Sequence, residues 1–237
     1  MLGKGSNTLI DPDANKTFVQ LSAHITEPSV DGNRLRINAA TPVAHLLQVA
    51  QSHGLSGLEF CAGVPAGVGG MVFMNFGCWG QEIAQFIHRV RAITNEGEDL
   101  WLSTADLQFG YRRSLFHQKN WIIVEAEFSC VPDSPDAIKN RIRENIQTRL
   151  AKQPLRDKTF GSIFKNPDGH FAAALLEKLG YKGYQANGIK LSEQHSNFLV
   201  NVSDASYKEA LIFIDRLIHD VKEKIGIQLE LEVRLAS

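Results

Sequence analysis

The sequence has 237 residues, of which 43% are hydrophobic and 22% charged, and this composition is ordinary for a folded protein of one or two domains. A formal net charge of −1, from 25 basic and 26 acidic residues, gives no long-range field that would gather nucleic acid or an anionic membrane. The three cysteines are widely spaced and the eight histidines scattered, which fits neither a disulfide framework nor a metal site. No apolar run approaches the roughly 20 residues that cross a bilayer. We therefore expect a cytoplasmic protein without metal, nucleic-acid or membrane partners.

A glycine turn opens the chain, and a strand and a helix follow it. The turn has the composition of a loop that follows a strand, so the chain is expected to begin in the middle of a fold. Its residues are Gly3, Gly5, Ser6 and Asn7. Residues 34–40 predict a strand. Thr41 and Pro42 then supply an N-cap and an N1 proline for a helix that ends at Gly54.

A glycine-rich stretch, CAGVPAGVGGMVFMNFGCWG at residues 61–80, is the most distinctive part of the chain. Repeated glycines let a backbone take positive φ or approach a ligand closely, and N–H groups exposed in this way can cradle phosphates. The stretch lacks the spacing of G-x-G-x-x-G and of the P-loop. A buried glycine-rich turn between two strands explains the composition equally well, so composition leaves both interpretations open.

Segments with strand character follow the glycine-rich stretch. Residues 89–94 and 99–103 predict a hairpin with a turn at 95–97, and residues 121–129 predict a further strand. Pro132 and Pro135 then disfavour regular structure, so we place a domain boundary between residues 131 and 132.

The rest of the chain, residues 132–237, predicts an α+β domain. Helices are expected over residues 136–152, 171–179 and 204–224, and strands over 196–201 and 227–235. Strict four-residue spacing in the helix over 136–152, apolar residues along the helix over 204–224 and alternation in the last strand give the expected apolar faces. Among the residues expected on those faces are Ile146, Leu150, Ile212 and Leu235.

Three polar segments contain side chains that could take part in binding or catalysis. Arg112, beside Tyr111 and between two phenylalanines, could hold a carboxylate bidentately, although a surface arginine is the simpler interpretation. The turn at residues 161–167 puts a hydroxyl, an ammonium and an amide together, but an ordinary capped loop would also explain it. Glu232 shares a strand face with Glu230, and an exposed strand face is the simpler explanation there too.

Taken together and in order, these motifs resemble the UDP-N-acetylenolpyruvoylglucosamine reductase family. The matching pieces are LGKGSNTLI, GVPAGVGGMVFMNFGCWG, FGYRRSLF, GSIFKNP, KLSEQHSNFLVN and LELEVR, and they cover nearly the whole chain. The absence of an insertion between Tyr111 and the strand at Trp121 resembles the family's shorter, second type. The resemblance implies FAD as cofactor and NADPH as reductant in cell-wall peptidoglycan precursor synthesis. The substrate would be a nucleotide sugar, and the family is usually monomeric.

The resemblance also implies a role for individual residues. Arg112 and Glu232 match the pair that stabilises the enolate-like intermediate, and Ser162 matches the serine that protonates C2 after hydride transfer to C3. The positions that match substrate contacts are Tyr111, Lys165 and Asn166. The positions expected to bind FAD are Gly3, Gly5, Ser6, Asn7, Gly63, Val64, Pro65, Gly67, Gly69, Gly70, Asn75 and Gly77.

The implied fold is an α+β, vanillyl-alcohol-oxidase-like FAD-binding domain followed by a smaller α+β substrate-binding domain. Residues 1–20 would be the remnant of a first FAD subdomain that is largely missing, 21–131 the second FAD subdomain, and 132–237 the substrate domain, whose last strand returns Glu232 to the active site. The family usually has about fifty more residues before the GKGSN loop, so the chain is expected to be truncated at its N-terminus.

Departures from the family pattern keep two alternatives open. Ala66 replaces a glycine, Gly67 a hydroxyl residue, and Phe76 and Trp79 add bulk where the flavin is expected. A non-catalytic nucleotide-sugar binding homologue that has lost FAD would explain these changes. A flavin oxidase of the same fold is the other alternative, although no histidine or cysteine for covalent flavin attachment is evident.

Overall fold

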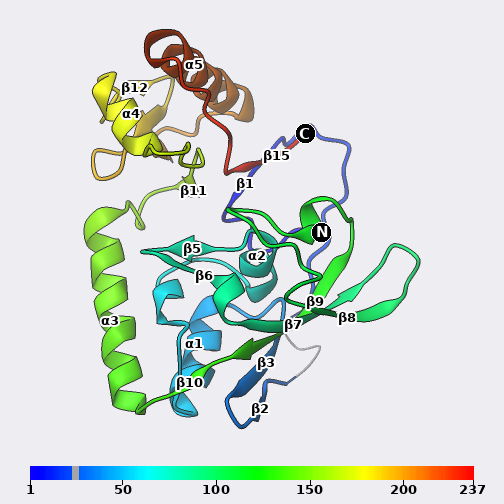
Figure 1. Cartoon of the computed structure of the whole chain (residues 1–237). Coiled ribbons are helices and arrows are strands. Elements are labelled where there is room, and N and C mark those ends of the chain that lie inside the picture. The colour runs from blue at the N-terminus through cyan, green and yellow to red at the C-terminus, as the bar shows by residue number, and fades with distance from the viewer. Residues whose placement is uncertain (23–26) are drawn as a thin grey trace. The chain divides into compact units, whose positions relative to one another are not determined.

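The structure is a computed structural model that describes residues 1–22 and 27–237, and it has mixed α+β content in two compact units (Figure 1). The first unit contains residues 1–4 and 18–148, and the second contains 5–17 and 149–237. The division therefore falls within helix α3 (Pro135–Lys152), after the two prolines at which the sequence analysis placed a boundary. Pro135 begins this helix, where its missing N–H costs nothing.

A five-stranded antiparallel sheet organises the first unit, with strand order β2-β3-β9-β7-β8. Its strands are β2 (Ser29–Asp31), β3 (Arg34–Asn38), β7 (Ile87–Ile93), β8 (Asp99–Ser103) and β9 (Ile122–Ser129). The predicted strands and the β7–β8 hairpin are confirmed. Two further two-residue pairings join β4 (Leu55–Ser56) to β10 (Val131–Pro132) and β5 (Gly77–Cys78) to β6 (Gln81–Glu82).

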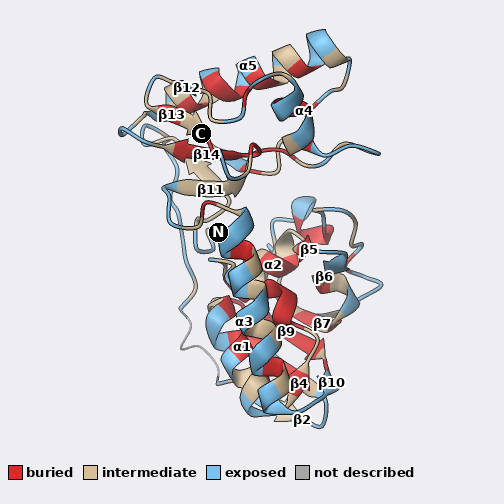
Figure 2. Cartoon of the chain, turned by 90° about the vertical axis from the view of Figure 1, so that its left-hand side faces the viewer, coloured by how far each residue is buried: buried red, intermediate tan, exposed pale blue. Residues whose placement is uncertain are grey.

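The core of the first unit lies between this sheet and helices α1 (Val43–Ser52) and α2 (Val68–Phe73). Figure 2 shows the buried residues gathered on those elements. The helix expected from Thr41 begins later, because Pro42 is the extended N-cap residue and Val43 is the first helical one. Gly54 has φ +64° and ends the helix as expected. No helix among the described residues is both long and apolar enough to cross a membrane.

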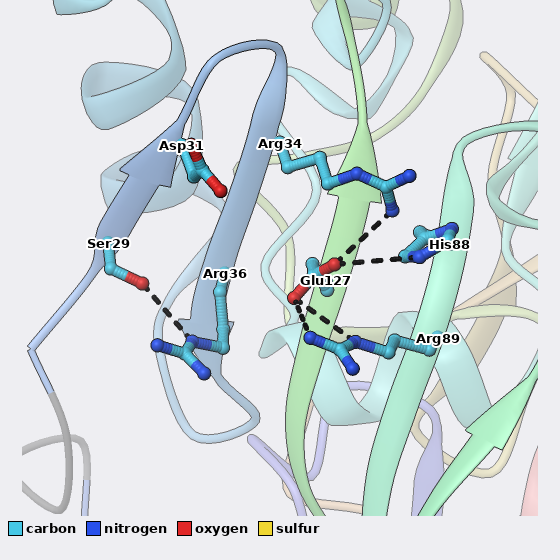
Figure 3. A pocket seen from close by; sticks show the side chains of 7 residues that line it. All are labelled: Ser29, Asp31, Arg34, Arg36, His88, Arg89 and Glu127. Atoms are coloured by element: carbon cyan, nitrogen blue, oxygen red, sulfur yellow. Dashed lines mark hydrogen bonds and ion pairs between the residues drawn. The ribbon is translucent and has the colours of Figure 1, made fainter.

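The other face of the sheet carries an ion-pair network centred on Glu127 (Figure 3). Arg89 donates to Oε2 of Glu127 at 2.9 and 3.2 Å, and Arg34 donates to Oε1 at 3.4 Å. Burial alone would raise the pKa of Glu127, but Arg89, His88 and Arg34 outweigh it and the net shift is downward. The network lines a cavity of about 360 Å³, whose walls are Ser29, Asp31, Arg34, Arg36, His88, Arg89 and Glu127.

The second unit is built on a four-stranded antiparallel sheet with strand order β11-β14-β13-β12. The strands are β11 (Thr159–Ser162), β12 (Gln185–Ala186), β13 (Ile189–Leu191) and β14 (Phe198–Asn201). Helices α4 (Ala172–Lys178) and α5 (Tyr207–Ile225) complete its core. In addition, β1 (Thr8–Ile10) pairs in parallel with β15 (Arg234–Ala236), which brings residues from both ends of the sequence together.

The predicted strand over residues 227–235 is wrong for most of its length, because only β15 is regular. Glu232 lies before β15, where the N–H groups of Glu232 and Val233 both donate to the Ile163 carbonyl instead of following a ladder. The alternation still predicts burial of Leu229 and Val233, whereas Leu235 is exposed.

Two predicted apolar faces are narrower than the sequence indicates. On α3, Ile138 is buried, but Ile146 and Leu150 are exposed. On α5, which begins at a capping box between Ser206 and Glu209, Phe213 is buried and Ile212 is exposed. Leucine and isoleucine at exposed helix positions are common, so spacing alone overestimates the buried stripe.

The ion-pair network predicts how stability depends on pH. Replacing Glu127 with Gln should lower the free energy of unfolding by about 1–3 kcal/mol at neutral pH, because the arginines lose their buried carboxylate. The folded-state pKa of Glu127 lies below its ordinary 4.5, so this stabilisation is present above pH 4.5 and is lost as the pH falls through the folded value. Urea unfolding of both proteins over a pH series measures the difference. The exposed Glu98→Gln is the control, and a difference that persists unchanged at about pH 3 would contradict the assignment.

Candidate active site

The predicted catalytic arginine lies on a tight turn in the first unit. Gly110 and Arg113 exchange two backbone hydrogen bonds of 3.0 Å, and Arg112 between them has φ +53°, which is unusual for a residue with a side chain. Arg112 Nη2 donates to the carbonyl of Gly77 at 2.7 Å, and the guanidinium lies 4.9 Å from the centre of the Tyr111 ring. The turn thus holds the guanidinium against the end of the glycine-rich stretch.

Asn75 holds the start of this turn in place. The side chain is buried, its Nδ2 donates to Glu82 Oε2 and to the Gly110 carbonyl at 2.9 Å each, and its Oδ1 accepts from the Ala84 N–H at 3.0 Å. We expected Asn75 to bind the cofactor. These bonds engage the side-chain amide of Asn75 in the arginine turn.

Ser114 holds the other end of the same turn. Its Oγ donates to the Phe73 carbonyl, at the last residue of α2, over 2.6 Å, and only 1% of the residue is exposed. The turn that carries Arg112 is therefore tied at both ends to the segment that contains the glycine-rich stretch. Nothing in the sequence pattern assigned Ser114 this role.

The glycines of the stretch divide into two kinds. A Cβ on Gly67 or Gly69 would come within 3.2 or 3.3 Å of the Ala39 carbonyl oxygen, and Gly69 N–H donates to that oxygen at 2.7 Å. A side chain at either position would therefore press on the turn before α1. A Cβ on Gly70 would meet nothing within 4 Å, and Gly63, with φ +80°, is exposed.

The accessible backbone beside Gly63 and Gly70 fits a flat cofactor that approaches the main chain. Pro65 is exposed and Val64 half-buried, so the segment between the two glycines presents little side-chain bulk of its own. Phe76, which we expected to obstruct a flavin, packs instead against the core with its ring stacked 6.1 Å from that of Phe60. The residues present are therefore compatible with bound FAD.

The second unit contains the predicted proton donor. Gly161 has φ +84° and the register of β11 shifts between Thr159 and Ser162, so the chain kinks immediately before the serine. A Cβ on Gly161 would lie 3.8 Å from the Ser6 carbonyl oxygen. The loop that contains Gly5, Ser6 and Asn7 is thus beside the serine-bearing strand. Gly3 is in the first unit.

Glu232 is held next to that strand by its backbone. Its N–H donates to the Ile163 carbonyl at 2.8 Å, and its own carbonyl accepts from Asn7 Nδ2 at 3.1 Å. Because Ile163 directly follows Ser162, the structure brings Ser162, Glu232 and Asn7 together although they are far apart in sequence. Asn7 was expected at the cofactor, and here its amide connects the glycine turn to the glutamate.

The two predicted substrate contacts of the second unit follow the serine. Lys165 Nζ lies 3.3 Å from Glu230 Oε2, and this pair is largely exposed on the glutamate side. Asn166 Oδ1 accepts from the N–H of Ala172, the first residue of α4, at 3.0 Å. The amide of Asn166 therefore contributes to the start of that helix.

Sequence reasoning missed Asn197, which forms two buried hydrogen bonds with Phe164, two residues after the predicted proton donor. The motif KLSEQHSNFLVN contains it, but the motif gives no sign of which residue the amide contacts. Burial lowers the pKa of the neighbouring His195. Neither side chain was expected at the site.

The amide of Asn75 predicts a specific pH response. Asn75→Asp should lower the free energy of unfolding by about 2 kcal/mol at neutral pH, because a carboxylate cannot donate to Gly110 and would face that of Glu82. Burial and Glu82 should raise the pKa of the new carboxyl, so the loss should shrink as the pH falls and the protonated form donates again. Chemical unfolding at about pH 8 and about pH 5, with the exposed Asn95→Asp as control, tests this. A loss that grows in acid would contradict the assignment.

Two family models match the chain. The model described as "UDP-N-acetylenolpyruvoylglucosamine reductase, C-terminal domain" matches residues 153–236. The model described as "FAD binding domain" matches residues 1–103. The range 1–103 contains the glycine-rich stretch, and the range 153–236 contains Ser162, Asn197 and Glu232.

Curated relatives and a solved structure agree with these models. The UDP-N-acetylenolpyruvoylglucosamine reductase of Streptococcus pneumoniae strain CGSP14 is 37% identical over 235 residues, which is 99% of this chain and 78% of that protein. That of strain ATCC 700669 / Spain 23F-1 is also 37% identical, with 74% of its length covered. The crystal structure of the reductase from Thermus caldophilus has a TM-score of 0.85 at 32% identity and covers 100% of this chain and 84% of its own. The chain therefore belongs to the UDP-N-acetylenolpyruvoylglucosamine reductase family of FAD-dependent oxidoreductases.

Proposed function

We infer that this protein catalyses the FAD-dependent, NADPH-using reduction of UDP-N-acetylglucosamine enolpyruvate to UDP-N-acetylmuramate. The observation that carries this proposal is that Ser162 and Glu232 lie on neighbouring segments. The Glu232 N–H donates to the carbonyl of Ile163, which is the residue after Ser162. A protein that only binds a nucleotide sugar has no need of a hydroxyl and a carboxylate held in this way. When bound, FAD supplies the hydride for the enolpyruvyl double bond, with NADPH as its source.

We propose that backbone groups hold the cofactor. In the first unit these belong to the accessible segment that contains Gly63, Val64, Pro65 and Gly70, with Gly67, Gly69 and Gly77 shaping it. In the second unit they belong to Gly5 and Ser6, beside Gly161. Main-chain N–H groups in glycine-rich turns are suited to a diphosphate because they converge without side-chain obstruction.

Arg112 is proposed to bind the substrate carboxylate and to stabilise the negative charge that develops there. A guanidinium can donate two parallel hydrogen bonds to a carboxylate, and its turn fixes its orientation before substrate arrives. Glu232 would share a proton with the same carboxylate and complete the stabilisation of the enolate-like state. Preorganised charge of this kind is commonly the largest contribution to catalysis.

Ser162 is proposed to donate the proton to C2 of the substrate. A hydroxyl is a weak acid in water, but a carbanion is basic enough to take its proton when the two are within hydrogen-bond reach. Among the described residues no hydrogen-bond partner occupies the Ser162 Oγ, which is half-buried in the structure. The backbone thus fixes where the side chain of Ser162 begins, and the hydroxyl is available to a bound substrate.

Further substrate contacts, the biological role and the cellular location are proposed on the same basis. Lys165 suits a diphosphate by charge, and Tyr111 and Asn166 are proposed to contact the rest of the nucleotide sugar. The product is a peptidoglycan precursor, so we propose a role in cell-wall synthesis, and through it in cell shape and division. A cytoplasmic monomer is the proposed form. Among the described residues the three cysteines form no disulfide, which suits a reducing compartment, and the monomer is what the family resemblance implies.

The visible absorption spectrum with and without added FAD tests the proposal first. Oxidised flavin bands that bleach with NADPH and return only when UDP-N-acetylglucosamine enolpyruvate is added, under anaerobic conditions, would support it. Failure to bind FAD in excess would contradict it and favour a non-catalytic homologue. Reoxidation by oxygen but not by the enolpyruvyl substrate would favour an oxidase.

Ser162→Ala should separate the two halves of the reaction. NADPH should bleach the flavin at an unchanged rate, whereas the substrate-driven return should slow by about 10²–10⁴-fold because the proton donor is gone. Stopped-flow absorbance measures both rates. Ser192→Ala, which changes a buried serine of the same unit outside the pair, is the control. A return rate within a few-fold of wild type would exclude Ser162 as the proton donor.

A further inference from the structure

One asparagine side chain in the second unit pairs with a backbone residue through both of its polar atoms. Asn197 Oδ1 accepts from the Phe164 N–H at 3.0 Å, and Asn197 Nδ2 donates to the Phe164 carbonyl at 2.7 Å. Both residues are buried, at 3% and 1% exposure. A carboxamide offers a donor and an acceptor in one plane, so it reproduces the pairing of a peptide group just before β14 begins.

The backbone of Asn197 extends this clamp toward the catalytic pair. Its carbonyl accepts from the Ile163 N–H at 2.9 Å, and the Ile163 carbonyl accepts in turn from Glu232 N–H. Phe164 also forms a β-bridge with Leu231. The segment that follows Ser162 is therefore held on one side by Asn197 and on the other by the chain that carries Glu232.

A second asparagine, at the other end of β14, provides a comparison. Asn201, the last residue of β14, also pairs both ways with one backbone residue: Oδ1 accepts from the Ala205 N–H at 3.0 Å and Nδ2 donates to the Ala205 carbonyl at 3.1 Å. This clamp holds the loop before α5. The Asn201 N–H donates to the Lys158 carbonyl just before β11, and within the described part of the chain the Asn201 side chain forms no hydrogen bond with the segment after Ser162. Both asparagines pair with one backbone residue through Oδ1 and Nδ2, but Asn197 pairs with Phe164 and Asn201 with Ala205.

We propose that Asn197 is a positioning residue that fixes the Ser162 hydroxyl and the Glu232 carboxylate relative to each other. The proposal rests on the function proposed above for those two residues. Loss of the clamp leaves a buried carbonyl at Phe164 without its donor, so the backbone between the two groups shifts or opens. Proton delivery is sensitive to such shifts, because a misplacement of about 1 Å can cost about 100-fold in rate.

The proposal is tested with Asn197→Asp, and Asn201→Asp is the control, both in the full FAD-loaded protein. Each aspartate has the shape of the asparagine and keeps the acceptor, but when ionised it cannot donate to the facing carbonyl. Three quantities are measured for each variant: the rate of flavin bleaching by NADPH, the rate of substrate-driven return, and the free energy of unfolding. The rates are compared with wild type at about pH 8.5 and about pH 6, because burial raises the pKa of an introduced carboxyl.

For Asn197→Asp we expect the substrate-driven return to slow by about 10- to 100-fold at the higher pH, with NADPH bleaching unchanged. At the lower pH the protonated carboxyl donates to Phe164 again, so the deficit should shrink. Asn201→Asp, at a half-buried position, should be destabilised less than Asn197→Asp, while both rates stay within about twofold of wild type. Equal slowing in the two variants, equal slowing of both half-reactions, or an unchanged return rate in Asn197→Asp would overturn the proposal.

Amide hydrogen exchange of the wild-type protein gives a second test that needs neither a variant nor activity. If Asn197 holds the segment as one unit, the N–H groups of Ile163, Phe164 and Glu232 open together and show the same protection. Protection of Glu232 that is more than about tenfold lower than that of Phe164 would overturn the clamp. If wild-type protein shows no substrate-driven return, the proposed function fails, while this exchange result still decides the structural claim.

Discussion

The arrangement of the second unit depends on the backbone segment from Gly161 to Lys165. On one side it pairs with Asn197 and β14, and on the other with residues 230–233 through the Ile163 carbonyl and the Lys165 N–H. Backbone hydrogen bonds have fixed lengths and directions, so they place side chains more reproducibly than long flexible side chains place themselves. A serine and a glutamate that lie 70 residues apart in number are adjacent for this reason, and the amide of Asn7 adds a third segment to the same junction.

In the first unit, a side-chain amide and a side-chain hydroxyl hold the turn that carries Arg112. Asn75 and Ser114 fasten the two ends of the arginine turn, and the guanidinium itself completes the attachment at Gly77. Positive φ at both Asn75 and Arg112 is unfavourable by itself, so these bonds must compensate for the backbone conformation. The glycine-rich stretch thus also supports the arginine turn.

Local patterns predicted local structure well. Alternation and a turn signal were sufficient for β7, β8 and β9, and the order of six motifs was sufficient for the family. The prediction failed where the partner is distant in sequence, because the alternation of residues 227–235 indicates burial but not that Ile163 takes the place of a ladder partner. For the same reason the sequence indicated asparagines at positions 7 and 75 without showing that their amides bind the backbone of Glu232 and Gly110. Phe76 resembled an obstruction to the flavin until its ring was found packed against the core.

The parallel pair of β1 and β15 also constrains how the protein folds. Thr8 pairs with Arg234, so this contact closes a loop that spans nearly the whole sequence. Closing a long loop costs chain entropy before any contact is gained, and contacts of high sequence separation therefore form late. The first unit uses no residue after Thr148, whereas β1 pairs with residues 234–236. The junction of Asn7, Ser162 and Glu232 is consequently among the last parts of the molecule to assemble.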